Sequence, residues 1–452
     1  EGSLHADMMH FDAFKMADGT PFLLISNHGG LSVSYDNLET AENIGLSTLN
    51  VSQYYSVATD PTDPRFVYAG SQDQGFQRCG QFDNQDIAFF EQVISGDYGH
   101  IAFSHGGENL WTVYPGGWVT MYTNPKQGTL TAAYDMDSEQ ESVWLPPVVS
   151  GPDAYEGGVY MAGGSIEGGT GSHLVKLSWQ GGAIVPSQSD FDFYDASGGA
   201  LSAIGASAAN HEYWYSATTN GRFFYSRDGG DSWEQSVNFI PDGHYLYGQA
   251  ILTSKFDPER VILAGSGYSG PAVHLSTDGG ENFTPMSQGL PSTLVFDLAS
   301  NEAETMYFAA TEAGPYVYFT EAGRWYDLAG QCAPAQTYWS VEYLEQEKVA
   351  RFGTYGRGIW DFEIETTVND KQPAFADIEV QLGPNPTRGP LWVQLPQGQW
   401  EIQLVNNGGQ VIRTWQGQSG QLQLQLSAAP GLYFLQLSQN GILQATRPVV
   451  IQ

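Results

Sequence analysis

The chain has 452 residues, of which 13% are aromatic and only 15% are charged, and its 17 basic and 50 acidic residues give a formal net charge of −33. This charge argues against a nucleic-acid-binding protein, because duplexes attract basic surfaces. The aromatic content argues against a disordered chain, and no apolar run is long enough to span a bilayer as a helix. We therefore expect a folded acidic protein with no nucleic-acid partner and no transmembrane segment.

Apolar, β-rich segments that end in small residues recur along the first 365 residues. Their starts lie 43 to 54 residues apart, which is the period of propeller blades built from four short strands. Turns rich in Pro and Asp separate each segment from the strand before it, and no stretch shows a long helical period. An all-β fold is therefore expected. The segments begin at Leu23, Val67, Leu110, Val159, Tyr213, Val261, Met306 and Val349.

We name the four strands of each blade A to D, from the propeller axis outward. The spacing predicts a β-propeller of about eight four-stranded blades in residues 1–365. The eighth unit ends near Ile364 without a D strand of its own, and only residues 1–4 precede the first A strand. We expect the last blade or the ring to be incomplete, or to be completed by an upstream fragment or a partner chain, since open sheet edges are normally covered.

Two polar hairpins share one pattern, Ser226-Arg-Asp-Gly-Gly-Asp-Ser-Trp233 and Ser276-Thr-Asp-Gly-Gly-Glu-Asn-Phe283. The Asp can accept N–H bonds inside the turn, glycines allow positive φ, and the aromatic residue can pack between blades. The pattern resembles the Asp-box of sialidase-type and sortilin-type propellers, which implies a place on the C–D hairpin at the blade periphery. We assign it a structural role. The residues are Ser226, Asp228, Gly230, Trp233, Ser276, Asp278, Gly280 and Phe283.

A longer series of motifs is similar to secreted bacterial propellers of the sortilin-like, BNR-repeat group, often labelled glycosyl-hydrolase-like. The resemblance covers about residues 5 to 365. Such relatives usually have Asp where His28 stands and Gly where Tyr98 stands, and they usually carry further blades upstream. The matching motifs are His5-Ala-Asp-Met-Met-His10, Asn27-His-Gly-Gly30, Gly70-Ser-Gln-Asp-Gln-Gly75, Ser95-Gly-Asp97 and Gly353-Thr-Tyr-Gly-Arg-Gly-Ile359.

The texture of the chain changes after Glu365. Residues 366–376 are expected to be a linker, and the alternating strands of residues 377–452 predict a small β-sandwich. Pro384-Asn-Pro-Thr-Arg-Gly389, Gly431-Leu-Tyr433 and Asn440-Gly441 resemble the C-terminal sorting domain of type IX secretion cargo. The resemblance implies export to the outside or the outer surface of a bacterium. An adhesion module is the alternative, and retention or removal of this domain stays open.

The D–A and B–C loops of a propeller converge near the axis on one face, which is where a ligand site is expected. Asp73 and Asp97 are candidate catalytic carboxylates, because paired carboxylates at the right separation hydrolyse glycosides. In the alternative, loop N–H groups hold both carboxylates. The candidate ligand-binding residues are His5, Asp7, His28, Gln72, Tyr55, Glu312, Tyr355 and Arg357.

Several signals argue against an enzyme. A sialidase needs three arginines around a carboxylate, and Arg357 alone is well placed on this face. No Ser-His-Asp or P-loop signature occurs. We expect no cofactor and no metal, with calcium as an alternative that has no assigned site, because no Asp/Gly turn matches a full calcium loop. Cys79 and Cys332 are either one long-range disulfide or two buried thiols.

The leading hypothesis is therefore a secreted cell-surface propeller with a non-catalytic role in binding, adhesion or extracellular assembly. An extracellular glycan or protein, or a second copy of the chain, would be its partner. A glycoside hydrolase acting on an extracellular polysaccharide is one alternative. A peptide-binding module of the sortilin type is the other.

Overall fold

A computed structural model of the protein describes residues 4–5, 7–45, 51–80, 88–138, 143–153, 156–239, 248–330, 333–364, 380–406, 410–439 and 442–451. The chain divides into two compact units, Glu1–Ile364 and Glu365–Gln452. The expected linker, residues 366–376, lies outside the described residues. Within the described residues, no helix has the length and apolar character needed to cross a membrane.

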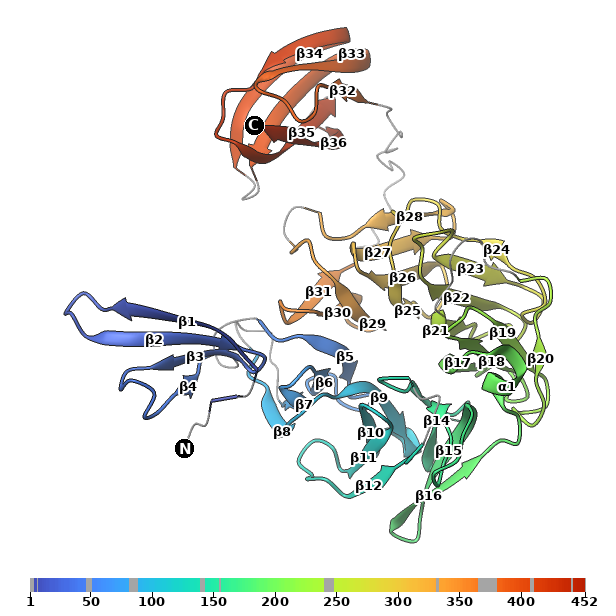
Figure 1. Cartoon of the computed structure of the whole chain (residues 1–452). Helices are drawn as coiled ribbons and strands as arrows, with labels where there is room; N and C mark the ends of the chain where they lie inside the picture. Colours follow the sequence, from blue (N-terminus) through green and yellow to red (C-terminus); the bar gives the residue numbers. More distant parts are fainter. Residues whose placement is uncertain are drawn as a thin grey trace. The chain divides into compact units, whose positions relative to one another are not determined.

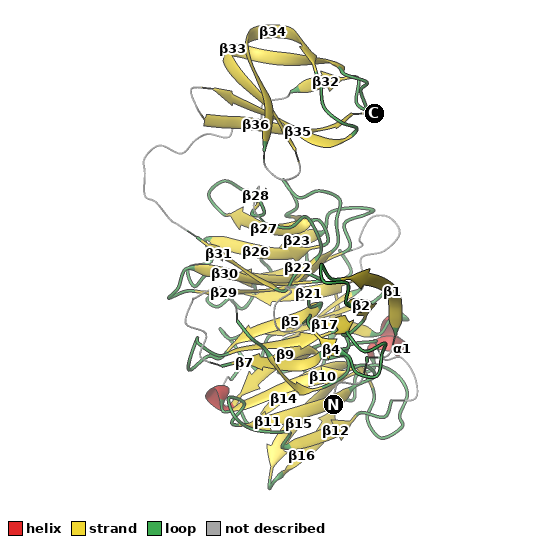
Figure 2. Cartoon of the chain, turned by 90° about the vertical axis from the view of Figure 1, so that its left-hand side faces the viewer, coloured by secondary structure: helices red, strands yellow, loops and turns green. Residues whose placement is uncertain are grey.

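The first unit consists of antiparallel sheets whose strands follow one another in chain order (Figures 1 and 2). Seven of these sheets have four strands and one has three, which confirms the all-β, propeller-like prediction. The first four sheets contain β1 (Met8–Lys15), β2 (Pro21–Asn27), β3 (Gly30–Ser34), β4 (Glu42–Asn43); β5 (Tyr54–Thr59), β6 (Val67–Ser71), β7 (Gly75–Cys79), β8 (Glu91–Ile94); β9 (Gly99–Ser104), β10 (Asn109–Tyr114), β11 (Trp118–Thr123), β12 (Ala132–Asp135); and β13 (Val148–Ser150), β14 (Gly158–Gly164), β15 (His173–Gln180), β16 (Ala183–Gln188).

The next four sheets continue this pattern. They contain β17 (Leu201–Ala206), β18 (Trp214–Thr218), β19 (Phe223–Ser226), β20 (Glu234–Gln235); β21 (Gly248–Thr253), β22 (Val261–Gly265), β23 (Val273–Ser276), β24 (Thr284–Pro285); β25 (Val295–Ser300), β26 (Met306–Thr311), β27 (Gly314–Phe319), β28 (Arg324–Asp327); and β29 (Tyr338–Leu344), β30 (Val349–Thr354), β31 (Ile359–Glu363). Two short helical turns also occur, η1 (His105–Gly107) and α1 (Phe193–Ser197).

Seven of the eight sheets form the ring. Neighbouring sheets contact one another from β5 round to β29, mostly through their inner strands, with β14 rather than β13 contacting β17, and β29 lies beside β5. The sheet β1–β4 stands outside this closure (Figure 1). Its inner strand β1 is exposed at all eight residues, whereas the equivalent strand β5 is buried at all but one of its six. The sequence period therefore predicts the number of blade-like sheets, but it does not tell which of them has a neighbour on both faces.

A buried polar network joins the last blade to the first blade of the ring. The N–H of Thr59 in β5 donates to Glu342 Oε2 at 2.9 Å, and the Thr59 hydroxyl also donates to Glu342. Arg351 donates to Thr59 Oγ1 at 2.7 Å and to Asp361 at 2.8 and 2.7 Å. Burial raises the pKa of Glu342, and Thr59 and Arg351 oppose this shift. In the described residues the last blade has three strands. The side-chain network therefore acts beside backbone bonds across the seam, in which the N–H groups of Gly356 and Gly358 donate to Ser52 O at 3.2 and 3.3 Å.

The two polar hairpins connect third and fourth strands at the outer part of their blades. Asp228 accepts the Ser232 N–H at 2.9 Å and the Ser226 hydroxyl at 2.7 Å, and Gly230 adopts a φ of 93°. Trp233 packs with Leu174 and Phe224 from two neighbouring blades. The Ser276 hairpin repeats the bonds, with Asp278 accepting from Asn282 at 2.9 Å, and Ser34 and Asp36 in the first sheet do the same with Thr40.

The second unit is one five-stranded sheet with β33 at its centre, paired to β32, β34 and β35. The alternating apolar residues of β33 and β35 point to one side, where Trp400, Ile402 and Leu437 form part of a buried core. A shift in register between Leu395 and Gln399 interrupts the long pair β33–β34. The strands are β32 (Gln381–Gly383), β33 (Pro390–Asn406), β34 (Val411–Gln425), β35 (Gly431–Gln439) and β36 (Ile442–Ile451).

Candidate ligand site at the seam of the ring

Six of the inner strands of the ring carry a bulge near the start of the strand. At each bulge, one residue has no partner in the register with the second strand of the blade. A bulge changes the direction of the side chain at that position. The bulged residues are Tyr55, His100, Ser202, Gln249, Phe296 and Trp339.

Three of these bulged residues and two loop residues form a continuous aromatic group, which we call the axial aromatic group (Tyr55, Trp144, Phe296, Trp339 and Tyr355). The ring centroid of Tyr55 lies 5.5 Å from that of Trp144 and 5.2 Å from that of Trp339. Trp339 stacks on Phe296 at 4.2 Å and contacts Tyr355 at 5.2 Å. Trp144 is 56% exposed, so the group presents a solvent-accessible indole to an incoming ligand.

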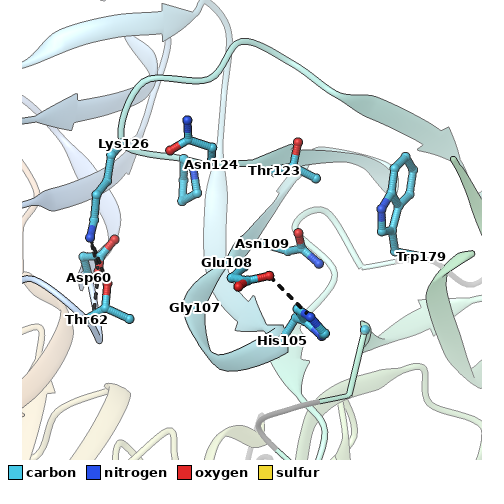
Figure 3. Close-up of a pocket in the computed structure, with 12 residues that line it drawn as sticks. Asp60, Thr62, His105, Gly107, Glu108, Asn109, Thr123, Asn124, Lys126 and Trp179 are labelled. Atoms are coloured by element: carbon cyan, nitrogen blue, oxygen red, sulfur yellow. Dashed lines mark hydrogen bonds and ion pairs between the residues drawn. The ribbon is translucent and has the colours of Figure 1, made fainter.

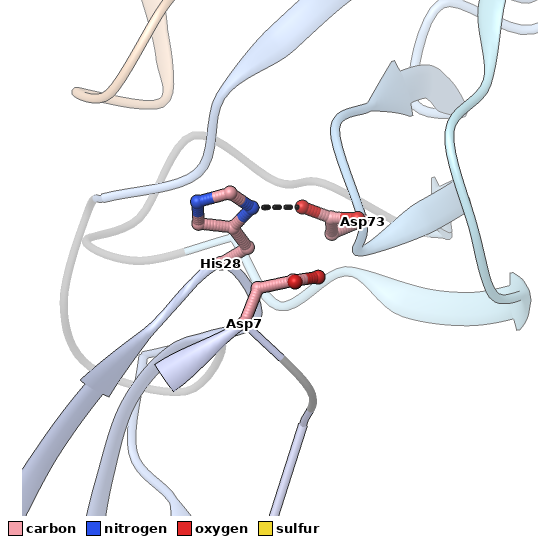
Figure 4. A group of neighbouring side chains, drawn as sticks. All are labelled: Asp7, His28 and Asp73. Carbon is pink, nitrogen blue, oxygen red and sulfur yellow. Dashed lines mark ion pairs between the residues drawn. The ribbon is translucent and has the colours of Figure 1, made fainter. Parts of the chain in front are cut away.

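The polar side of the site lies on the loops of the first ring blade, next to this aromatic group. Tyr355 donates its hydroxyl to Gln72. The neighbouring Asp73 donates its N–H to Asp97 Oδ1 at 3.1 Å, and its own Oδ2 lies 2.9 Å from His28 Nδ1 (Figure 4). Burial raises the pKa of the Asp97 carboxyl; the Asp73 carboxylate adds to this rise, while the Asp73 N–H and the nearby histidines oppose it. Burial likewise raises the pKa of Tyr55 and Tyr355.

The first sheet reaches this polar group through its loops. Gly29 O accepts from Gln74 Nε2 of the ring at 2.9 Å. His5 packs on Gly29 so closely that a Cβ at that glycine would lie 2.8 Å from the histidine Cβ. Asp7 lies beside His28 and Asp73, and one ligand atom of each residue falls within 4.8 Å of the others. His5, Asp7 and His28 therefore lie where the first sheet meets the ring.

Two further sequence candidates lie on turns of other blades. Glu312 is on the β26–β27 turn, where its N–H donates to Leu294 O at 3.0 Å. Arg357 is on the β30–β31 turn, where its N–H donates to Thr354 Oγ1 at 3.0 Å. Both side chains are exposed. Sequence reasoning did not name Trp144, Phe296 or Trp339; an aromatic residue at the second position of an inner strand is the signal that finds the last two.

A groove of about 800 Å³ lies at the other end of the blades, on A–B and C–D loops (Figure 3). Asp60 on its wall accepts from Thr62 at 2.9 Å and from Tyr68 at 3.0 Å, and it pairs with Lys126 at 3.2 Å. These bonds occupy the carboxylate, so this wall is structural. Trp179 and His105 line the other part of the groove.

Cys79, the other sequence candidate in the first ring blade, is a buried free thiol whose pKa is raised by burial. This state corresponds to the unpaired alternative for Cys79. Cys332 lies outside the described residues.

Comparison with known protein families gives a match in the C-terminal unit. Residues 381–452 match the family described as the secretion system C-terminal sorting domain. The chain carries a secretion sorting domain. It is therefore a secreted protein, and the domain indicates export to the cell surface or the extracellular space.

The fold of the first unit also has a solved counterpart. The chain is similar to the β-propeller domain of Cps50 (Swd1) from Myceliophteria thermophila, with a TM-score of 0.51 and 11% identity over 69% of this chain and 97% of that chain. At this identity the likeness concerns the propeller fold alone. No curated protein sequence matches the chain.

Proposed function

We propose that this secreted propeller is a non-catalytic binding protein of the bacterial surface, and that the axial site binds an extracellular glycan. The observation that carries the proposal is the axial aromatic group, in which exposed Trp144 adjoins the buried ring of Tyr55. Aromatic faces bury the apolar C–H faces of a sugar, while a few polar groups fix its orientation. Gln72 and the Tyr355 hydroxyl supply such groups beside the rings.

The same geometry argues against hydrolysis at this site. Glycoside hydrolysis needs two carboxylates that flank the scissile bond. Here Asp97 accepts a loop N–H and Asp73 pairs with His28, as in the alternative in which loop groups hold both carboxylates. A glycoside hydrolase is therefore the less favoured candidate, and a sortilin-type peptide site is the third.

The test is binding of the purified full chain to a panel of soluble and insoluble bacterial and plant polysaccharides, with products measured by reducing-sugar release. For a bound polysaccharide, Trp144→Ala is expected to weaken affinity by roughly tenfold, since about 1.4 kcal/mol of contact energy is lost. The matched control is Trp179→Ala in the groove at the other end of the blades.

The outcomes separate the candidates. Loss of binding in Trp179→Ala but not in Trp144→Ala would place the glycan site in the groove and refute the axial site. Product release that disappears in Asp97→Asn would establish the hydrolase instead. Binding of unstructured peptides, competed by no polysaccharide, would favour the sortilin-type role.

A second candidate role, extracellular assembly, is favoured by the first sheet. It has the strand order and turn bonds of a blade, yet β1 exposes apolar residues, such as Met9 at 69% and Phe11 at 44%, that blades of the ring bury against one another. A surface of this kind fits the face of another blade, so we propose a second copy of this chain as its occupant.

Light scattering of the full chain tests this role. A concentration-dependent dimer is expected, and Met9→Lys should make it monomeric, whereas Phe256→Lys at an equally exposed position in the ring should not. A wild-type chain that stays monomeric at all concentrations would refute self-assembly. It would leave an upstream fragment or a different partner chain to cover the sheet.

A further inference from the structure

Asp7, His28 and Asp73 converge where the first sheet meets the ring (Figure 4). We propose that these three residues, which we call the joint triad, bind one divalent transition-metal ion of the Zn²⁺ type. The ion would link the sheet β1–β4 to the first blade of the ring. This inference does not depend on which ligand the axial site takes.

The distances are those of a site that needs only small side-chain rotations to close. In tetrahedral coordination at 2.0–2.1 Å, neighbouring ligand atoms lie roughly 3.3 Å apart. His28 Nδ1 and Asp73 Oδ2 are 2.9 Å apart, slightly closer than this. All three ligand atoms lie within 4.8 Å of one another. A cation would therefore draw Asp7 inward and separate the His28–Asp73 pair slightly.

The backbone holds each side chain at a loop position. Asp7 directly precedes β1, His28 is in the β2–β3 turn, and Asp73 is in the β6–β7 turn. A hydrogen bond from Gln74 Nε2 to Gly29 O at 2.9 Å ties the last two loops together. Gln74 directly follows Asp73 and Gly29 directly follows His28, so this hydrogen bond fixes the distance between the two ligand-bearing loops.

The charge at the joint also favours a cation. Asp7, Asp73 and Asp97 bring three carboxylates together, and in the described part of the chain no lysine or arginine forms an ion pair with any of them. The chain carries a net charge of −33, so the wider field also attracts cations.

The donor set selects the kind of metal. One imidazole and two carboxylates suit Zn²⁺ and similar ions, whereas Ca²⁺ takes oxygen ligands only. Three protein ligands leave a fourth position for water or a ligand oxygen, as in open zinc sites. The side chain of His28 is 37% exposed and that of Asp73 17%, whereas Asp73 Oδ2 itself is buried and has no hydrogen-bond partner among the described residues.

This site differs from what the sequence suggests. The sequence predicts no metal, and it names Asp7 and His28 only as candidate ligand-binding residues and Asp73 as a candidate catalytic carboxylate. The structure instead packs His5 on Gly29 and places Asp7 beside two residues from other loops. Only the fold brings these segments together, since Asp73 belongs to a different sheet from Asp7 and His28.

The test uses the full chain after dialysis against EDTA. Titration with Zn²⁺ is followed by calorimetry, and Co²⁺ is used as a spectroscopic probe, since tetrahedral Co²⁺ absorbs strongly in the visible range. Wild type is expected to bind one equivalent and to unfold at a higher temperature in excess Zn²⁺. His28→Ala and Asp73→Asn should each lower the affinity by 10-fold or more and abolish the tetrahedral Co²⁺ spectrum.

His211→Ala is the matched control, because this exposed histidine lies on the A–B turn of another blade. It should bind Zn²⁺ as wild type does. Circular dichroism establishes that each variant is folded. Wild type without a one-equivalent phase would overturn the proposal, and so would His28→Ala and Asp73→Asn variants that are folded and bind the same equivalent unchanged.

Discussion

Replacing Arg351 by Met should open the seam of the ring. The guanidinium is 5% exposed and donates three hydrogen bonds of 2.7 to 2.8 Å, two to Asp361 and one to Thr59. Removing it leaves Asp361 without its ion-pair partner, and it removes the positive charge that opposes the rise in the pKa of Glu342. Breaking a fully buried ion pair costs about 3–5 kcal/mol, out of the roughly 5–15 kcal/mol that stabilises a domain. Because the Asp361 side chain is 33% exposed, this figure is an upper bound for Arg351→Met.

Urea unfolding of the full chain, followed by tryptophan fluorescence, measures this cost. The transition of the first unit should move to lower urea without a change in slope. Arg65→Met is the control, because Arg65 pairs with Asp63 on the surface, and it should unfold close to wild type. Adding Glu342→Gln to Arg351→Met removes the carboxylate whose charge Arg351 compensates, so the double variant should lose less stability than the two single losses summed.

A first-unit transition in Arg351→Met that coincides with wild type would refute the argument that the Arg351 network stabilises the seam. It would mean that packing between β29 and β5 suffices. Equal and additive losses in the two single variants would refute the narrower claim that Arg351 stabilises the ring by compensating Glu342.

Two further predictions concern single carboxylates. Burial raises the pKa of Asp297 to about 7 from 3.8, so the stability that its neutral form contributes is complete below about pH 4 and is lost as the pH rises towards 7. The free energy of unfolding of wild type should therefore fall over this range relative to that of Asp297→Asn, by at most about 1.4 kcal/mol per pH unit. Urea titrations at several pH values measure this difference. Asp228→Ala should cost about 1 kcal/mol in the same assay, because Ser232 N and the Ser226 hydroxyl lose their acceptor, whereas Asp231→Ala in the same exposed turn should not; equal losses would contradict a structural role for Asp228.

The sequence predicts the parts of the molecule whose signal is local. Strand periods, Pro/Asp turns and the repeated hairpin are set by neighbouring residues, so the sheets and the place of Trp233 follow from them. The second unit is equally predictable from the sequence, because apolar and polar residues alternate along its strands and its residues match a sorting domain. These features need no knowledge of which blades touch.

What the sequence cannot predict depends on closure. Whether the first sheet becomes part of the ring depends on which sheet faces pack against each other. The strands β1 and β5 have similar β-rich sequences, yet β1 is exposed and β5 is buried. The axial site also depends on closure of the ring. Tyr55 and Trp339 belong to opposite ends of the ring sequence and meet only because β29 lies beside β5.

The position of the axial site at the seam ties ligand binding to the integrity of the ring. A ligand that contacts Tyr55 in β5 and Trp339 in β29 spans the one junction between the last and first blades. Such a ligand binds the closed ring and not the open one, so it adds RT ln(1 + [L]/Kd) to the stability of the closed form. Because Arg351→Met weakens the same junction, it should also lower the apparent affinity of the axial site in proportion to the fraction of open rings. Trp144→Ala, by contrast, removes a contact and leaves closure intact.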